Sequence, residues 1–239
     1  MSKTSIIKFQ NVYKSYQTQS VLDHIDLDIH EGEFFGLVGV NGAGKTTLMK
    51  ILLDFCDVST GQIEILNTHH TRPHSRVQLA FLPEQFIPPY FLSGYQFLKY
   101  MANLHGHTHC EADIDNICHV LNLPRHVLKQ SVRDYSKGMA QKLGLAACFL
   151  SNKKILILDE PMSGLDPKAR AYIKRYLMSL KPKITLFFST HLLADVEALC
   201  DRMAILHEGS LKFIGTPSEC CQTFETNDLE QAYLRCIGE

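Results

Sequence analysis

A glycine-rich stretch with one lysine and two threonines points most directly to chemistry: Gly39-Val40-Asn41-Gly42-Ala43-Gly44-Lys45-Thr46-Thr47. It fits the pattern G-x-x-x-x-G-K-[ST], whose backbone N–H groups surround phosphate oxygens. The three glycines let the backbone curl around the anion. Lys45 would reach the β- and γ-phosphates as a positive charge, and the Thr46 hydroxyl can bind Mg²⁺. The stretch therefore predicts a site for a nucleoside triphosphate.

Two adjacent carboxylates, Asp159 and Glu160, follow an apolar run at 155–158. Open α/β sheets bind ligands at the carboxyl ends of their strands, which is where these two side chains would lie. Asp159 is suited to hold Mg²⁺, and Glu160 to orient and deprotonate an attacking water. Read without the phosphate loop, the same pair would simply begin a turn. His191 follows the apolar run 184–188 and is a third polar group at a strand end, although a lone histidine is more often structural.

The elements that must position these residues can be predicted from apolar spacing. A strand at 33–38 precedes the phosphate loop and a helix at 48–53 follows it. The continuous apolar runs 155–158 and 184–188 are typical of parallel strands that are buried on both faces. Further strands are expected from the segments 6–12, 21–29, 60–66, 77–83, 203–206 and 211–214, and a closing helix from 229–236.

The segment 86–150 differs from the rest because its periodicity is helical and it is interrupted by prolines and glycines. We expect one domain over residues 1–239, with this segment inserted as a helical subdomain. The predicted fold class is α/β, a P-loop NTPase core of mainly parallel strands with an N-terminal antiparallel β-layer. Large apolar residues at 86, 87, 90, 91 and 95 line either a docking groove beside the insertion or the core of the insertion itself.

Composition excludes several classes of protein. Of the 239 residues, 45% are hydrophobic and 21% charged, with a formal net charge of −1, so neither a disordered chain nor a nucleic-acid-binding protein is expected. The longest apolar runs are strand-sized, and no signal peptide is expected. The eight cysteines form no C-x-x-C pair and are expected to be buried, reduced thiols. The cluster from His105 to Cys110 could bind metal, although a solvated loop is the more ordinary interpretation.

In sequence order, five stretches resemble the nucleotide-binding subunit of an ATP-binding cassette (ABC) transporter: 39–47, Tyr135-Ser136-Lys137-Gly138-Met139, Ile155-Leu156-Ile157-Leu158-Asp159-Glu160-Pro161, Ser163-Gly164-Leu165-Asp166 and Ser189-Thr190-His191. The resemblance covers nearly the whole chain. It implies that Tyr16 stacks on adenine, that Glu160 is the general base and that His191 contacts the γ-phosphate. A surface or hairpin tyrosine is the ordinary alternative for Tyr16.

The resemblance also implies a dimer. Ser136 and Gly138 would belong to a signature loop that closes over ATP bound to the opposite subunit, and Asp166 to a loop that crosses the same interface. The free N–H groups at the start of the helix after Ser136 suit a γ-phosphate.

Three positions depart from the family pattern. Val40 stands where proline is common, and the signature has Lys137 and Met139 in place of a glycine and a glutamine. That variant resembles the subgroup that works with separate, mostly exporting, membrane subunits. The glutamine that contacts Mg²⁺ and water is either Gln85 or, by strict alignment, replaced by Glu84, and we favour Gln85.

The sequence thus predicts an ATPase subunit that uses ATP and Mg²⁺ and dimerises around two ATP molecules. It would drive a separate transmembrane permease, an exporter, from the cytoplasmic face of the membrane. The expected metal ligands are Thr46, Asp159 and Gln85, and the expected catalytic groups are Glu160, His191, Gln85 and Lys45. A soluble ABC-type ATPase in DNA repair or translation is the alternative, but it would need a coiled coil, a second cassette or a basic surface. No nucleic-acid partner is expected.

Overall fold

Two long antiparallel strands begin the part of the chain that the computed structural model describes, residues 4–106 and 111–238. Strand β1 (Ser5–Tyr16) pairs with β2 (Gln19–His30) on one side and with β4 (Thr60–Ile65) on the other, and the short β5 (Thr68–His69) completes the sheet. The strand predicted at 21–29 is confirmed; Ile25, Leu27 and Ile29 are buried in alternation with exposed residues, whereas Leu22 is buried out of phase with them because the pairing with β1 shifts register between Leu22 and Ile25. Tyr16 is the last residue of β1 and pairs with Gln19.

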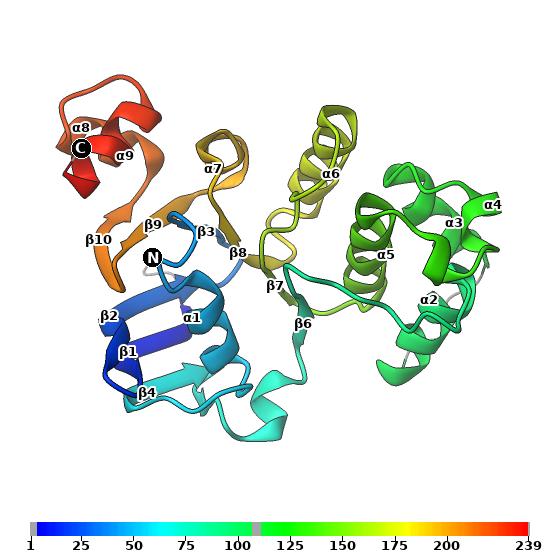
Figure 1. Ribbon diagram of the computed structural model, residues 1–239, viewed down its shortest axis with the longest axis horizontal. Coiled ribbons are helices and arrows are strands. Elements are labelled where there is room, and N and C mark those ends of the chain that lie inside the picture. Colours follow the sequence, from blue (N-terminus) through cyan, green and yellow to red (C-terminus); the bar gives the residue numbers. More distant parts are fainter. Residues whose placement is uncertain (1–3, 107–110, 239) are drawn as a thin grey trace.

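The second sheet has six strands in the order β10-β9-β3-β8-β7-β6 (Figure 1). They are β3 (Phe34–Val38), β6 (Leu79–Leu82), β7 (Ile155–Leu158), β8 (Thr185–Thr190), β9 (Arg202–His207) and β10 (Ser210–Gly215). All neighbouring pairs are parallel except β9 and β10. Strand β6 is shorter than the predicted 77–83, because a 3-10 turn, η1 (Pro73–Arg76), is capped by Val77.

Alternate residues of the central strands belong to two different hydrophobic cores. Ile155, Ile157 and Phe187 pack with helix α1 (Lys45–Leu52) and the antiparallel sheet, whereas Leu156, Leu158 and Phe188 pack with the helices on the opposite face. Because both faces are covered, β7 is apolar at every position and β8 is apolar from 186 to 188. The sheet can therefore hold polar residues at its carboxyl edge on a rigid base.

The region between β6 and β7 is helical from residue 94 onward, and its helices form a group beside the sheet (Figure 1). They are α2 (Gly94–Leu104), α3 (Glu111–Val120), α4 (Arg125–Leu128) and α5 (Lys137–Leu150), with a 3-10 turn η2 (Val132–Asp134). Residues 83–93 contain no regular element among the described residues. In that segment Phe86 packs into the core, as does Tyr95 of α2, whereas Ile87, Tyr90 and Phe91 are largely exposed, at 84%, 69% and 75%. Two of the five apolar residues therefore belong to the core, and the other three are exposed.

Four more helices follow: α6 (Pro167–Leu180), α7 (Leu193–Leu199), α8 (Pro217–Thr223) and α9 (Leu229–Ile237). Helix α9 matches the predicted closing helix. Together with α7, β9 and β10, the last two helices enclose a third, smaller core that contains Cys220 and Val196. In the part of the chain described, no helix is long and apolar enough to cross a membrane. None of the described cysteines forms a disulfide, and burial raises the pKa of Cys118 and of Cys148 to about 12, so both stay protonated thiols.

Candidate nucleotide-binding site

The phosphate loop connects the carboxyl end of β3 to the start of α1, and its backbone requires glycine. Gly44 caps α1 with φ +111°, a left-handed conformation that side chains rarely adopt. A Cβ atom on Gly39 would lie 2.3 Å from the carbonyl oxygen of Leu206 on β9. The loop is therefore held tightly against the sheet at one end and turned sharply into the helix at the other.

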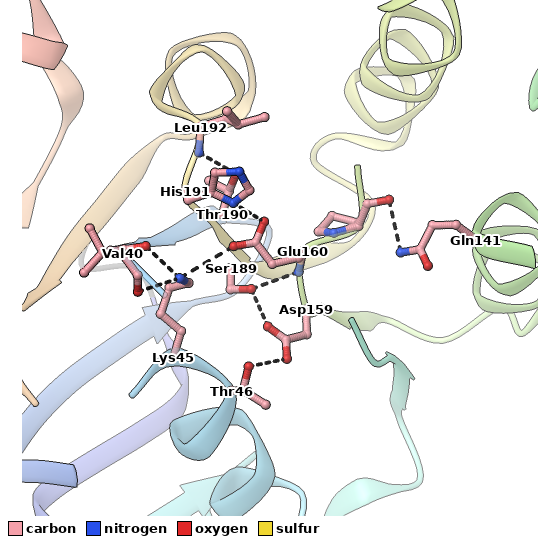
Figure 2. Close-up of polar contacts among 12 residues, drawn as sticks. Val40, Lys45, Thr46, Gln141, Asp159, Glu160, Ser189, Thr190, His191 and Leu192 are labelled. Atoms are coloured by element: carbon pink, nitrogen blue, oxygen red, sulfur yellow. Dashed lines mark hydrogen bonds and ion pairs between the residues drawn. The ribbon is translucent and has the colours of Figure 1, made fainter. Parts of the chain in front are cut away.

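Lys45, the first residue of α1, is nearly buried and faces the loop that precedes it. Its Nζ donates to the carbonyl oxygens of Gly39 at 2.6 Å and Val40 at 3.2 Å, and lies 3.6 Å from Glu160 Oε1 (Figure 2). A positive charge is thus fixed at the centre of the loop. Phosphate oxygens, which carry full negative charge, would replace neutral carbonyls as its partners.

Asp159 and Glu160 lie at the carboxyl end of β7, as predicted, and both are buried. Thr46 Oγ1 donates to Asp159 Oδ2 at 2.8 Å, and Ser189 Oγ on β8 donates to Asp159 Oδ1 at 2.5 Å (Figure 2). Both carboxylate oxygens therefore accept a hydroxyl. Thr46 and Asp159 supply two adjacent oxygen ligands of the kind that Mg²⁺ prefers.

Glu160 has a strained backbone and a carboxylate with two different environments. Its φ is +47°, in the left-handed region that residues other than glycine seldom occupy. Oε2 lies 2.9 Å from Nδ1 of His191, whereas Oε1 is buried without a hydrogen bond among the described residues and faces Lys45. Strain of this kind concentrates at functional sites, where surrounding contacts hold it in place.

A cavity of about 190 Å³ opens between these groups. It is lined by Val21, Asn41, Gly42, Gly44, Lys45, Thr46, Thr47, Glu84 and Glu160. Within the loop, Gly39 and Ala43 are buried and Val40 is exposed. The structure places Glu84, rather than the favoured Gln85, in the cavity lining.

Tyr16 is half-exposed and is not part of this lining. The Nζ of Lys14 lies 4.8 Å from the centre of the Tyr16 ring, and a hydrogen bond to the Cys56 thiol raises the pKa of the Tyr16 hydroxyl. One face of the ring is therefore covered by a cation. A purine would have to use the other face.

The residues expected to act across a dimer interface lie together, apart from the cavity. Ser136 caps α5 by accepting the Met139 N–H at 3.2 Å, and a Cβ on Gly138 would lie 3.2 Å from the Gly164 carbonyl oxygen. Asp166 caps α6 in the same way, accepting the Ala169 N–H at 2.9 Å. That hydrogen bond lowers the pKa of Asp166, so the exposed carboxylate stays charged.

Among residues 4–106 and 111–238, no group of three histidine, cysteine or acidic side chains is arranged to hold a metal ion. Most of the histidine cluster considered above, residues 107–110, lies outside the described residues.

A scan against protein-family models matches residues 22–163 to the ABC transporter family. The chain belongs to this family. It is an ATP-binding subunit, an ATPase with the P-loop fold. An uncharacterised ABC transporter ATP-binding protein of Synechocystis is 36% identical over 228 residues, covering 91% of this chain and 64% of the relative. The bacitracin transport ATP-binding protein BcrA of Bacillus licheniformis is 34% identical over 212 residues, covering 87% and 69%.

The chain therefore spans about two thirds of the length of these relatives. The solved structure of an ATP-binding subunit of an ABC transporter superimposes with a TM-score of 0.86 at 27% identity, covering 97% of this chain and 99% of that one.

Two residues of this site were not singled out by sequence reasoning. Ser189 bridges Asp159 and the backbone of Glu160, accepting the Glu160 N–H at 2.9 Å. Its position beside His191 at the end of an apolar run was the available signal. Gln141 of α5 is buried and donates to the carbonyl oxygen of Pro161 at 3.3 Å, which connects the signature helix to the turn after Glu160 (Figure 2).

Proposed function

We propose that the subunit hydrolyses ATP with Glu160 as general base and powers a separate membrane permease. The observation that carries this proposal is the convergence of Lys45, Thr46, Asp159, Glu160 and His191 at the carboxyl ends of three adjacent parallel strands. The residues that follow β3, β7 and β8 come together at the carboxyl edge of the sheet, where open α/β sheets bind their ligands.

The chemistry follows from what each group can still do. Glu160 Oε1 is buried and accepts no hydrogen bond from the described residues, so it is free to accept a proton from an attacking water. His191 holds the other carboxylate oxygen at 2.9 Å and fixes its orientation. Lys45 and the N–H groups of the loop neutralise the charge that develops on the phosphate oxygens during in-line displacement.

Thr46 and Asp159 would hold Mg²⁺, with Glu84 or Gln85 completing the site across the cavity. When bound, the ion supplies neutralisation of the β- and γ-phosphate charge. Glu84 is favoured for this position because it lines the cavity.

A second copy of the subunit would complete the site. Ser136, Gly138 and Asp166 do not line the cavity, yet they lie together on adjoining helix starts. The N-terminus of α5 offers N–H groups and a positive dipole to an anion. We therefore place the signature loop of one subunit over the ATP of the other, with Tyr16 as the adenine platform.

The membrane partner would dock on the exposed apolar residues Ile87, Tyr90 and Phe91, which a solvated loop does not need. Bacitracin transport in a named relative supports a role in transport, and we infer an exported cargo and a position on the cytoplasmic face of the membrane. The soluble, non-transport ATPase is the less favoured function, because the relatives are named as ABC transporter and bacitracin transport ATP-binding proteins.

The test is ATP-dependent dimerisation of the Glu160→Gln variant by size-exclusion chromatography. This variant should be a monomer without nucleotide and a dimer with Mg-ATP, because ATP is bound and not cleaved. Adding Ser136→Arg should restore the monomer, whereas Ser218→Arg, an equally exposed serine at the start of α8, should not. A dimer that persists with Ser136→Arg would contradict the proposed interface.

A further inference from the structure

Ser189 is the last residue but one of β8 and is fully buried. Parallel pairing sets Leu158 of β7 beside Phe188, so Ser189 lies one step further along, beside Asp159. On its other side Ser189 is paired with Leu37 of β3, the strand that leads into the phosphate loop. The residue is thus held between the two strands that carry the nucleotide-binding and the acidic groups.

Both hydrogen-bonding functions of the Ser189 hydroxyl point at the acidic pair. Its O–H donates to Asp159 Oδ1 at 2.5 Å, and its oxygen accepts the backbone N–H of Glu160 at 2.9 Å (Figure 2). The direction of each bond is fixed, because an N–H can only donate and the hydroxyl has one proton. One side chain therefore constrains a carboxylate and the following peptide group at once.

Those constraints act on the strained part of the site. The backbone of Glu160 has φ +47°, and its carbonyl accepts the Ser163 N–H at 3.0 Å, so the peptide groups on both sides are anchored. The Glu160 side chain projects from this turn toward Lys45 and His191. If the N–H of Glu160 lost its partner, the turn could relax and the carboxylate would move from its place.

We propose that Ser189 is a positioning residue for ATP hydrolysis, which orients the metal-binding carboxylate of Asp159 and the general base Glu160 through one hydroxyl. This inference rests on the proposed function, because it assigns Ser189 a role in a reaction that needs both acids. A purely structural serine would contribute to folding without a specific effect on the acidic pair.

The chain provides a matched control on the same strand. Thr185, at the opposite end of β8, is also buried and uses its hydroxyl to accept the Gly32 N–H at 2.9 Å. Thr185→Ala leaves the part-buried Gly32 N–H without its partner, whereas Ser189→Ala removes the partner of the buried Glu160 N–H and of Asp159 Oδ1. Only the Ser189 change removes hydrogen bonds from the acidic pair.

The experiment measures the melting temperature, kcat and ATP binding by calorimetry, with Mg²⁺ and with EDTA, for the full-length chain and both variants. Ser189→Ala should lower kcat by about 10- to 100-fold, the effect of misplacing a reacting group by about 1 Å. It should also reduce the gain in ATP affinity that Mg²⁺ provides, while affinity in EDTA stays within about twofold. Thr185→Ala should lower the melting temperature similarly and leave kcat and the Mg²⁺ effect unchanged.

Ser189→Cys, which keeps the size but hydrogen-bonds weakly, should fall between wild type and Ser189→Ala, and it decides the matter if the alanine variant does not fold. The inference is overturned if kcat and the Mg²⁺ effect of the Ser189 variants stay within twofold of wild type, or if Thr185→Ala loses kcat equally. Glu160→Gln is measured in the same assay to test the proposed function separately. If this variant hydrolyses ATP at the wild-type rate, the proposed mechanism is refuted, whatever the Ser189 variants do.

Discussion

Replacing Glu160 by Gln removes one negative charge from the site and leaves nearly the same shape. The amide oxygen can still face Lys45, but it cannot take a proton from water. Because a positioned general base contributes about 10²- to 10⁴-fold, turnover should fall by that factor. ATP binding should survive or tighten, since the triphosphate no longer approaches a buried carboxylate.

The same substitution has a cost in the free protein that the structure lets us work out. Lys45 Nζ and Glu160 Oε1 are 3.6 Å apart, and both side chains are more than nine-tenths buried. At an effective dielectric constant of about 20, their attraction is about 5 kcal/mol before the offsetting cost of desolvation. Lys45 keeps its two carbonyl partners in the variant, so we expect a net loss of about 2 kcal/mol. For a chain of this length that corresponds to about 4–8 °C in melting temperature.

The assay combines phosphate release with thermal unfolding, each with and without Mg-ATP. ATP should recover most of the lost melting temperature in Glu160→Gln, because phosphate replaces the carboxylate as the partner of Lys45. Glu230→Gln is the control, since Glu230 is an exposed glutamate of α9 that does not line the cavity. A Glu160→Gln turnover within tenfold of wild type, or an equal loss in Glu230→Gln, would refute the assignment of the general base.

Three further outcomes are expected. Lys45→Ala should weaken ATP binding by about 2–3 kcal/mol, the value of hydrogen bonds to a charged group, and unchanged affinity in a titration would exclude Lys45 from the phosphate site. Tyr16→Ala should cost about 1–3 kcal/mol in ATP affinity if the open face of the ring stacks on adenine; GTP should compete well with ATP in wild type, and a variant that binds ATP as tightly as wild type would argue against stacking. Burial lowers the pKa of His70, so the unfolded chain binds a proton where the folded chain does not, and the unfolding free energy should fall as the pH drops below about 6.5 toward the lower folded value. His70→Gln should make this acid slope shallower in denaturant titrations at pH 5 to 7, and an unchanged slope would show that another group causes it.

The central strands could be predicted from sequence because both of their faces are buried. Continuous apolar runs predicted strands at 155–158 and 184–188, which correspond to β7 (Ile155–Leu158) and β8 (Thr185–Thr190). The place of the phosphate loop and of the acidic pair followed directly, since both are next to such strands in the chain.

Two helices that were not predicted carry local signals that could have been used. Asp166-Pro167 at the start of α6 is a cap followed by proline in the first turn. Thr216 and Glu219 form a capping box at the start of α8. Helix α6 has a narrow apolar face, and α8 is only seven residues long, so periodicity alone was weak in both.

Contacts between distant segments could not be obtained from spacing. Which of Glu84 and Gln85 faces the cavity depends on how residues 83–93, which have no regular element, leave β6. The burial of His70 depends on the pairing of β5 with β4. Sequence alone named these residue types without placing their partners.

The packing of Gly138 against the carbonyl of Gly164 ties the start of α5 to the turn that follows Glu160. A neighbouring subunit that contacts the start of α5 and a nucleotide that contacts Glu160 therefore both affect the turn between Glu160 and Gly164. By thermodynamic linkage, if bound nucleotide raises the affinity of the subunit for its neighbour by some factor, the bound neighbour raises the affinity for nucleotide by the same factor. The subunit would then release its ATP most slowly while it is bound to a neighbouring subunit.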